Sequence, residues 1–480
     1  MKTSFFRRHR KKTIALGVFG ALPFVAHCAI VLGTRMTPPP VEPVALGEPR
    51  TRADGVEQLG RSYVRPRGRI TEVRLVGSPD DIGHSHGTLL YDEMITSEGQ
   101  LYRTLDDLVP FKPFQWLIFD VARVAHAGAD RSMSPPRLRE ITAQARAFSP
   151  DPFESKFPTY QRLVYLNSLY DIALGFEHSP MMGCSSFAAS GPRTRGGHTI
   201  LARNFDFEAG SVYDEHKVVF LVFEDGKIPF ASVAWPGLVG VLSGMNRDGL
   251  SVVVHGGRAR DTTSDGEPVV HTTRALLSEA HDVTEAIELL RGRRAMVSHI
   301  LMLADATGRA VVVERAPGEE PFVREMERDA LPLTNHFEGP LASDPKNLRV
   351  REATSTLPRR ARLDELLSDE RPIDVARAVE ILRDKRGPGA TELPFGHRST
   401  LDAAIATHAV VMDSTDRTLW VSEGPHLLGR FLRFDLARLL DRAHEPRGDD
   451  PLVEIPADPA YIDGTYERWL EAGGRHDGAE

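Results

Sequence analysis

The cysteine in the body of the chain carries the clearest chemical signal in this sequence. The chain has two cysteines, Cys28 within an N-terminal apolar run and Cys184. A deprotonated thiol is a strong nucleophile, and an unpaired cysteine needs a reason in an exported chain, where cysteines usually pair or are absent. A buried small apolar side chain is the structural alternative. Cysteine usage alone leaves both interpretations of Cys184 open.

The glycine before this cysteine favours the catalytic interpretation. Gly183 has no side chain, so it tolerates the strained backbone that attack by Cys184 on the preceding carbonyl requires. Cleavage of the Gly183–Cys184 bond would create a free α-amino group, whose usual pKa of about 7.7–8.0 suits a general base. One residue would then supply both nucleophile and base, so no histidine partner is needed.

Polar residues gather at one end of the next predicted strand, residues 199–207. Alternation along a strand places Asn204 and Asp206 on one face and Arg203 on the other. Beside the thiol, Asp206 would orient an α-ammonium group or hold a substrate amide. We expect a twist or bulge to bring Arg203 to the same cleft. A surface hairpin with solvated charges is the alternative.

Four motifs in order along the chain resemble the acyl-coenzyme A:isopenicillin N acyltransferase family, which is similar in turn to bile-salt and penicillin V amidohydrolases and to acid ceramidase. The motifs read GCSSF (183–187), ARNFD (202–206), GMNRDGL (244–250) and LTNHF (333–337), and the resemblance runs over roughly residues 71–429. Each motif alone is weakly specific, but the ordered set with its Gly-Cys junction is specific. The resemblance implies an α+β fold, the αββα four-layer sandwich of N-terminal-nucleophile (Ntn) hydrolases. It also implies autocatalytic cleavage before the cysteine, and no metal or organic cofactor.

The resemblance gives roles to residues at matching positions. It implies that Cys184 is the nucleophile, that Asp206 orients its amine and that Arg203 favours the thiolate. Asn335 matches the donor that stabilises an oxyanion, an effect of about 3–4 kcal/mol per donor.

A second active-site arginine is implied in the segment 355–363. We take it to be Arg359, although Arg360 and Arg362 stay open as candidates because Pro358 departs from a smoothly helical pattern. A solvated basic turn is the alternative for this segment.

Substrate contacts are expected from two regions. The backbone near His255 and Gly256 would give a second oxyanion donor, and both residues are predicted to contact substrate. Trp235 and residues 239–245 would line an acyl pocket, with plain core strands as the alternative.

The elements that must position these residues fall into blocks. Residues 69–80 predict a strand, and apolar spacing predicts helices from 83 to 174, one of them starting at the proline pair 135–136. Strand signals follow at 185–189, 199–207, 217–223, 229–235 and 250–254, which we interpret as an antiparallel meander. Helices are predicted at 270–290 and 374–383, and hairpins at 300–314 and 409–422. Blocks of this kind favour an α+β fold over a doubly wound parallel sheet.

The N-terminus predicts export. Six basic residues precede an uncharged apolar run from Ile14 to Gly33, which is about long enough to cross a bilayer. We expect an uncleaved signal anchor, with a cleaved signal peptide as the alternative, and a catalytic body outside the cytoplasm. The predicted organisation is a transmembrane anchor (1–36), a proline-rich linker (37–65), a mostly helical pro-region (66–183), an Ntn β-chain (184–440) and a C-terminal tail (441–480).

The predicted function is an amidohydrolase or acyltransferase that cleaves linear amides of N-acylated small molecules through a Cys184 acyl-enzyme. Its expected partners are a small N-acylated substrate, the membrane, and its own cleaved N-terminal chain, retained after cleavage. A net charge of −8 gives no reason to expect nucleic acid. The alternatives are a catalytically inactive membrane-anchored binding protein on the same fold, and a metallohydrolase centred on His84 and His86, which lacks further ligands.

Overall fold

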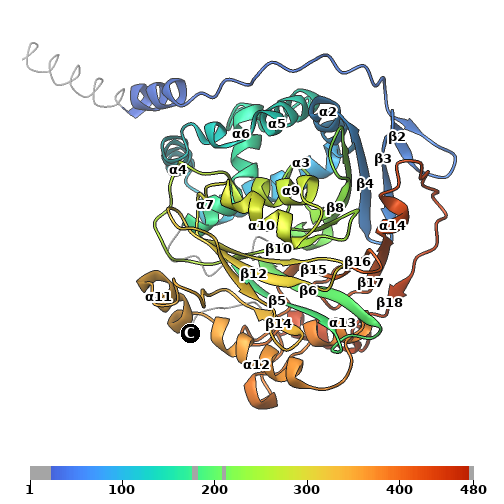
Figure 1. Cartoon of the computed structure of the whole chain (residues 1–480). Coiled ribbons are helices and arrows are strands. Elements are labelled where there is room, and N and C mark those ends of the chain that lie inside the picture. The colour runs from blue at the N-terminus through green and yellow to red at the C-terminus, as the bar shows by residue number, and fades with distance from the viewer. Residues whose placement is uncertain (1–22, 176–181, 208–211, 475–480) are drawn as a thin grey trace, which may run out of the picture.

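Two β-sheets lie face to face at the centre of the protein, with helices on both outer sides (Figure 1). This computed structural model describes residues 23–175, 182–207 and 212–474. Because helices and strands occupy separate layers, the predicted α+β class is confirmed.

The larger sheet has 11 strands, in the order β1 (Arg50–Thr51), β2 (Glu57–Leu59), β3 (Ser62–Arg67), β4 (Ile70–Gly77), β7 (Val218–Glu224), β8 (Phe230–Ala234), β9 (Ser243–Asn246), β10 (Ser251–Gly256), β11 (His299–Ala304), β12 (Ala310–Arg315) and β13 (Phe322–Glu325). The smaller sheet has seven, in the order β14 (Ala330–Leu333), β5 (Met182–Gly191), β6 (Gly197–Phe207), β15 (Ala406–Asp413), β16 (Thr418–Ser422), β17 (Phe431–Asp435) and β18 (Glu454–Ile455).

The helices begin with residues 23–33. Those of the predicted helical third are α2 (Pro79–Leu89), α3 (Tyr91–Leu108), α4 (Lys112–Ala125), α5 (Pro135–Ala147), α6 (Thr159–Asn167) and α7 (Leu169–Gly175). The later ones are α8 (Val212–Glu215), α9 (Val269–Glu279), α10 (Val283–Arg291), α11 (Pro345–Ala353), α12 (Thr356–Ser368), α13 (Val375–Leu382), α14 (Leu436–Leu439), α15 (Pro459–Ile462) and α16 (Thr465–Glu471).

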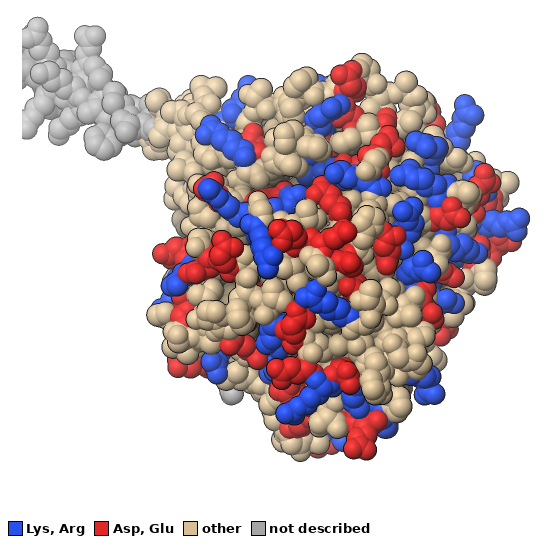
Figure 2. All heavy atoms as spheres, viewed as in Figure 1, with Lys and Arg blue, Asp and Glu red and all other residues tan. Residues whose placement is uncertain are grey.

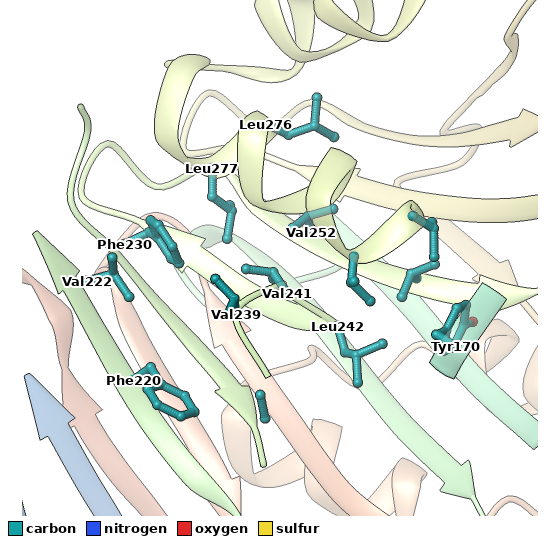
Figure 3. Packing of buried hydrophobic residues seen from close by; sticks show 14 of the residues in the cluster. Tyr170, Phe220, Val222, Phe230, Val239, Val241, Leu242, Val252, Leu276 and Leu277 are labelled. Atoms are coloured by element: carbon teal, nitrogen blue, oxygen red, sulfur yellow. The ribbon is translucent and has the colours of Figure 1, made fainter. Parts of the chain in front are cut away.

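Side chains alternate along each strand, so each sheet packs against helices on one face and against the other sheet on its second face. On β10, Val252 and Val254 pack toward helices, whereas Val253 points to the other sheet. On β6, Leu201 lies between the sheets and Ala202 faces α12 and α13. Successive side chains of a strand point to opposite faces, so both sheets are buried on both sides. Figure 3 shows part of the cluster between the larger sheet and its helices, where Leu277 of α9 lies near Phe230.

The predicted meander divides between the two sheets. Strands β7 to β13 are consecutive antiparallel neighbours, and β4 joins them through a parallel pairing with β7. Strands β5 and β6 instead form a hairpin that pairs with β14 and β15, which lie far away in the sequence. A single continuous meander was therefore wrong, because strand propensity does not specify the pairing partner.

Two glycines let α2 and α5 approach closely. A side chain on Gly83 or Gly87 would collide with the backbone carbonyl oxygens of Glu140 and Gln144 on α5. On the same helix, the buried His86 accepts a hydrogen bond from the backbone N–H of Gly237 at 2.9 Å. This histidine therefore has a packing role. Among the described residues, the one group suited to a metal is His198, Asp413 and Asp416, so nothing there supports a site at His84 and His86.

The predicted linker and tail both contain ordered elements. Residues 37–65 include β1, β2 and most of β3, because strand formers such as Tyr63 pair with β4. The Tyr63 hydroxyl donates a hydrogen bond to Glu72 at 2.8 Å inside the sheet. Residues 441–480 include β18, α15 and α16. Both segments therefore contain regular structure, and their predicted roles as linker and tail stay predictions.

The predicted anchor lies only partly within the described residues. Residues 23–33 form a helix, and residues 14–22 fall outside them. Within the described parts of the chain, we find no helix with both the length and the apolar character to span a membrane.

Candidate active site

The β5–β6 hairpin holds Cys184 opposite Phe205 and places Ser186 opposite Arg203. Residues that face each other across two strands point to the same side, so the thiol and the Arg203 guanidinium share one face. Arg203 Nη2 lies 3.5 Å from Cys184 Sγ. The predicted twist or bulge is therefore not needed. Alternation along β6 correctly places Arg203 on the opposite face from Asn204 and Asp206. It does not say which of these faces carries Cys184, because that depends on the register between β5 and β6.

Carbonyl groups from the larger sheet fix the buried Arg203 side chain. Its Nη1 donates to the carbonyl oxygen of Leu242 at 3.0 Å and its Nη2 to that of Val254 at 2.7 Å. The guanidinium carbon also lies 4.2 Å from the centre of the Phe205 ring. The positive charge beside the sulfur is thus held in place by backbone and aromatic groups.

Asn335 and Arg359 hold the backbone of Cys184. The amide N–H of Cys184 donates to Asn335 Oδ1 at 2.7 Å, and its carbonyl oxygen accepts from Arg359 Nη1. Arg359 Nη2 also donates to Asn335 Oδ1 at 2.9 Å, and Asn335 Nδ2 donates to the carbonyl oxygen of Gly256 at 3.0 Å. The two side chains therefore form one network around the peptide units of the thiol residue.

The structure distinguishes between the three candidate arginines. Arg359 is buried against Cys184, whereas Arg360 pairs with Glu338 and Asp364, and Arg362 pairs with Asp384 at 2.8 Å. Pro358 sits in the first turn of α12, where a missing backbone N–H leaves no helical hydrogen bond unmade. The segment is a helix and not a basic turn, and only Arg359 faces the thiol residue.

Asp206 lies beside Gly183, its partner across the hairpin. A side chain on Gly183 would come within 3.0 Å of Asp206 Oδ2. Burial raises the pKa of the Asp206 carboxyl to about 7; the neighbouring Arg359 opposes this effect and Asp402 adds to it. Asp206 Oδ1 has no hydrogen-bond partner within the described residues. The Asp206 carboxyl group therefore lies beside the residue before the predicted cleavage point, with Oδ2 nearest to Gly183.

A largely apolar cavity of about 740 Å³, including space open to solvent, lies next to this network. Its walls come from α3, α6, α7, β6, α8, the segment after β8 and α9. The lining residues are Met94, Ser97, Glu98, Leu101, Leu166, Asn167, Leu169, Tyr170, Phe205, Phe207, Tyr213, Trp235, Pro236, Gly237, Leu238, Leu242 and Val270. Phe205 and Leu242 connect the cavity with the site, because Phe205 pairs with Cys184 and Leu242 binds Arg203. Figure 3 shows Leu242 and Tyr170 near each other at one end of the buried cluster.

The predicted substrate contacts divide into two groups. Trp235 lines the cavity and donates from Nε1 to the carbonyl oxygen of Tyr213 at 2.7 Å. His255 and Gly256 do not line it; His255 Nε2 lies 2.6 Å from Ser186 Oγ, and the Gly256 carbonyl is occupied by Asn335. Burial, followed by the nearby Arg203 and Arg359, lowers the pKa of His255 well below its usual value, so this ring is neutral. Neither residue lines this cavity, and their direct contact with substrate stays a prediction.

Residues 239–245 include both predicted kinds of position, the lining of a pocket and the plain core. Leu242 lines the cavity, whereas Val239 and Val241 belong to the buried core.

Sequence reasoning missed Tyr170 and Glu98. Burial, together with the neighbouring Cys184, raises the pKa of the Tyr170 hydroxyl well above its usual value. Glu98 pairs with Arg162, and burial raises its pKa to about 7. The spacing of Met94, Glu98 and Leu101 on one face of α3 was the available signal, because residues three and four apart share a helix face.

Comparison with known proteins matches the same region. The family model described as acyl-coenzyme A:6-aminopenicillanic acid acyl-transferase covers residues 193–425. The chain is related to this family. The motif-based resemblance is therefore confirmed, over a shorter stretch than predicted. The match includes Arg203, Asp206, Asn335 and Arg359, whereas Cys184 precedes its first residue.

One relative is an uncharacterised protein from Archaeoglobus fulgidus, 23% identical over 272 residues. The alignment covers 51% of this chain and 44% of the relative, so the chain spans less than half the length of that protein.

Three solved structures are similar at low sequence identity. They are a Caenorhabditis elegans ortholog of N-acylethanolamine-hydrolyzing acid amidase (18% identical, 48% of this chain and 93% of that one, TM-score 0.34), a conjugated bile acid hydrolase from Clostridium perfringens (14%, 57% and 97%, 0.38) and penicillin V acylase from Agrobacterium tumefaciens (17%, 57% and 99%, 0.35).

Proposed function

We propose that this chain is a cysteine Ntn hydrolase that matures by cutting itself at Gly183–Cys184 and then cleaves linear amides of N-acylated small molecules. The observation that carries this proposal is the distance of 3.5 Å between the Arg203 guanidinium and the buried Cys184 thiol. Asn335 and Arg359 also bind the backbone of Cys184. A nearby cation favours the thiolate form of a cysteine.

Maturation begins with attack of the Cys184 sulfur on the carbonyl carbon of Gly183. The thiol proton passes to the departing amide nitrogen, the peptide C–N bond breaks, and a thioester links Gly183 to the sulfur. Water then hydrolyses this thioester, which leaves a Gly183 carboxylate and a free α-amino group on Cys184. Asp206 lies beside this bond with one oxygen unused, so it supports the proposal as the partner of the new ammonium.

Turnover uses the same sulfur with the new amine as base. The amine takes the thiol proton, the sulfur attacks the acyl carbon of the substrate, and the protonated amine gives its proton to the leaving amine. Water or an acceptor amine then takes the acyl group from the acyl-enzyme. Asn335 Nδ2 is the proposed oxyanion donor; this role requires it to exchange the Gly256 carbonyl, which it binds in the uncut chain, for the substrate oxygen.

The cavity supports an apolar acyl group as the substrate portion next to the sulfur. Its walls are mainly aromatic and aliphatic, with Phe205, Phe207 and Trp235 together on one side of β6. The buried Glu98 and Ser97 lie in the same wall of α3 and suit a polar group on the substrate.

We also propose that the catalytic body lies outside the cytoplasm. Six basic residues before the apolar run Ile14–Gly33 form the pattern of an export signal, which supports this location. Hydrolysis is then favoured over coenzyme-dependent transfer, because acyl-coenzyme A is a cytoplasmic donor.

The test measures cleavage and amide turnover together. Intact mass and N-terminal sequencing of the wild-type chain should give two fragments, the larger one beginning at Cys184, with hydrolysis of an N-acyl amide library. Cys184→Ala should remain one inactive chain, whereas Cys28→Ala, the matched control, should be cut and active. Amide turnover by Cys184→Ala would refute the proposal, and an uncut but active wild type would refute the maturation step.

A further inference from the structure

The outward face of α4 has the opposite polarity to that of an ordinary surface helix. Its buried residues are Gln115, Asp120 and Arg123. Its large apolar side chains are more than half exposed, namely Phe114, Trp116, Leu117, Val121 and Val124, and the preceding Leu108 and Phe111 are exposed as well. A surface helix in water normally buries its apolar side chains and exposes its polar ones. The outward side of α4 is therefore built for an apolar environment.

Hydrogen bonds on the inner side fix this orientation of α4. Gln115 Nε2 donates to Asp106 Oδ1 at 2.8 Å and to the carbonyl oxygen of Val109 at 2.7 Å. Arg123 Nη2 donates to the carbonyl oxygen of Lys156 at 2.7 Å. Rotation of the helix to bury its apolar side would break these bonds in a buried setting, which is costly.

The helix of residues 23–33 extends the same apolar surface. His27 stacks on Trp116 with ring centres 5.9 Å apart, and its Nδ1 lies 2.8 Å from Asp120. This helix exposes Phe24, Val25 and Leu32. We define the α4 surface as these three residues together with Leu108, Phe111, Phe114, Trp116, Leu117, Val121 and Val124. In Figure 2, the part of the molecule beside the grey N-terminal segment is mostly uncharged.

We propose that the α4 surface lies in the interface of a lipid bilayer. Residues 23–33 are the end of the uncharged run Ile14–Gly33, so the chain enters the folded body beside α4. Aromatic and aliphatic side chains of different lengths suit lipid, which needs no matching shape, and tryptophan favours the membrane–water boundary. This is a helix lying on the membrane, and it is independent of the proposed catalytic function.

The test uses tryptophan fluorescence of the full chain in vesicles of phosphatidylcholine and phosphatidylglycerol. Replacing the lipids by versions with brominated acyl chains should quench emission from the wild type. Trp116→Phe should remove most of this quenching, whereas Trp420→Phe, at a position in the smaller sheet, should retain it. Equal quenching in the two variants, or none in the wild type, would overturn the proposal.

A second pair of variants separates the α4 surface from the N-terminal segment. Leu117→Ser with Val121→Ser should lower the quenching of Trp116 and leave the circular dichroism unchanged, while the exposed pair Leu452→Ser with Val453→Ser should have no effect. Concentration-dependent dimers that only the first pair abolishes, without lipid quenching, would assign the surface to a second copy. Protection of Trp116 from acrylamide in lipid-free protein would assign it to residues 1–22. Either result contradicts the bilayer.

Discussion

At the scale of single residues, the adjacent Arg359 and Arg360 of α12 lie in different surroundings, one beside Cys184 and the other among acidic side chains. Arg359 binds the Cys184 carbonyl, the Ser185 hydroxyl at 2.9 Å and Asn335. Burial lowers the pKa of its guanidinium, and the nearby Asp206 opposes this shift. Arg360 lies one position further and pairs with acidic side chains near the surface. The same residue type therefore has a different environment at neighbouring positions.

We expect Arg359→Gln to lower amide turnover by about 100-fold or more, because it removes a charged donor from the backbone that holds the nucleophile. Arg360→Gln, the matched control, should stay within about twofold, since partly exposed ion pairs contribute little. Steady-state kinetics on folded, fully cleaved protein checks this. Equal losses in both variants would show that Arg359 has only a general charge effect.

At the scale of elements, the junctions between helices and sheets depend on buried groups that are not catalytic. Asp171 on α7 accepts the backbone N–H of Val269 at the start of α9, at 3.1 Å. Burial raises the pKa of this carboxyl to about 7, although the bond from Val269 opposes the shift. The folded protein thus holds a proton at this site that the unfolded chain releases near pH 4.

This carboxyl predicts a pH-dependent stability. Between about pH 4 and pH 7 the folded state binds more protons there, so this group's contribution is present below pH 4 and is lost as the pH rises toward 7. Asp171→Asn should make the slope less steep by this group's share, on the order of a few kcal/mol in total. The shares of Asp206 and Glu98, whose pKa values burial also raises to about 7, should remain. The exposed Asp225→Asn should leave the slope unchanged. Urea unfolding from pH 4 to pH 8 checks this. An identical slope in the wild type and Asp171→Asn would contradict it.

The α2–α5 contact gives a second prediction at this scale. Gly83→Ala should destabilise the protein by about 1–3 kcal/mol through overpacking against the Glu140 carbonyl, despite the higher helix propensity of alanine. Gly292→Ala, at the end of α10, should be nearly neutral, because the nearest atom to its side chain would lie 3.8 Å away. Thermal unfolding of both variants distinguishes packing from propensity; similar melting temperatures would argue against the close contact.

At the scale of the whole molecule, the chain before Cys184 is not an accessory segment. It supplies β1 to β4 of the larger sheet, and β4 pairs with β7 over seven residues. Its helices share one buried cluster with strands from the later part, through residues such as Ile141 and Leu163. Hydrophobic burial across this boundary is therefore extensive.

We expect both fragments of the cleaved chain to remain together in native buffer. Size-exclusion chromatography in a mild detergent should give one peak that contains both, and they should separate only in denaturant. The same experiment on Cys184→Ala should give a peak at the same position. Separation of the wild-type fragments without denaturant would contradict the shared core.

The sequence by itself determined which residues are the candidates for the chemistry and which class of fold holds them. Cys184, Arg203, Asp206 and Asn335 were recognisable because their motifs are local, and the strands and helices followed from periodicities of two and 3.6 residues. Tertiary structure decided the rest. The pairing of β5 with β6 set the face of the thiol, and the buried side of α12 selected Arg359. The inverted polarity of α4 also became visible only in the fold, because burial depends on neighbours that are distant in the sequence.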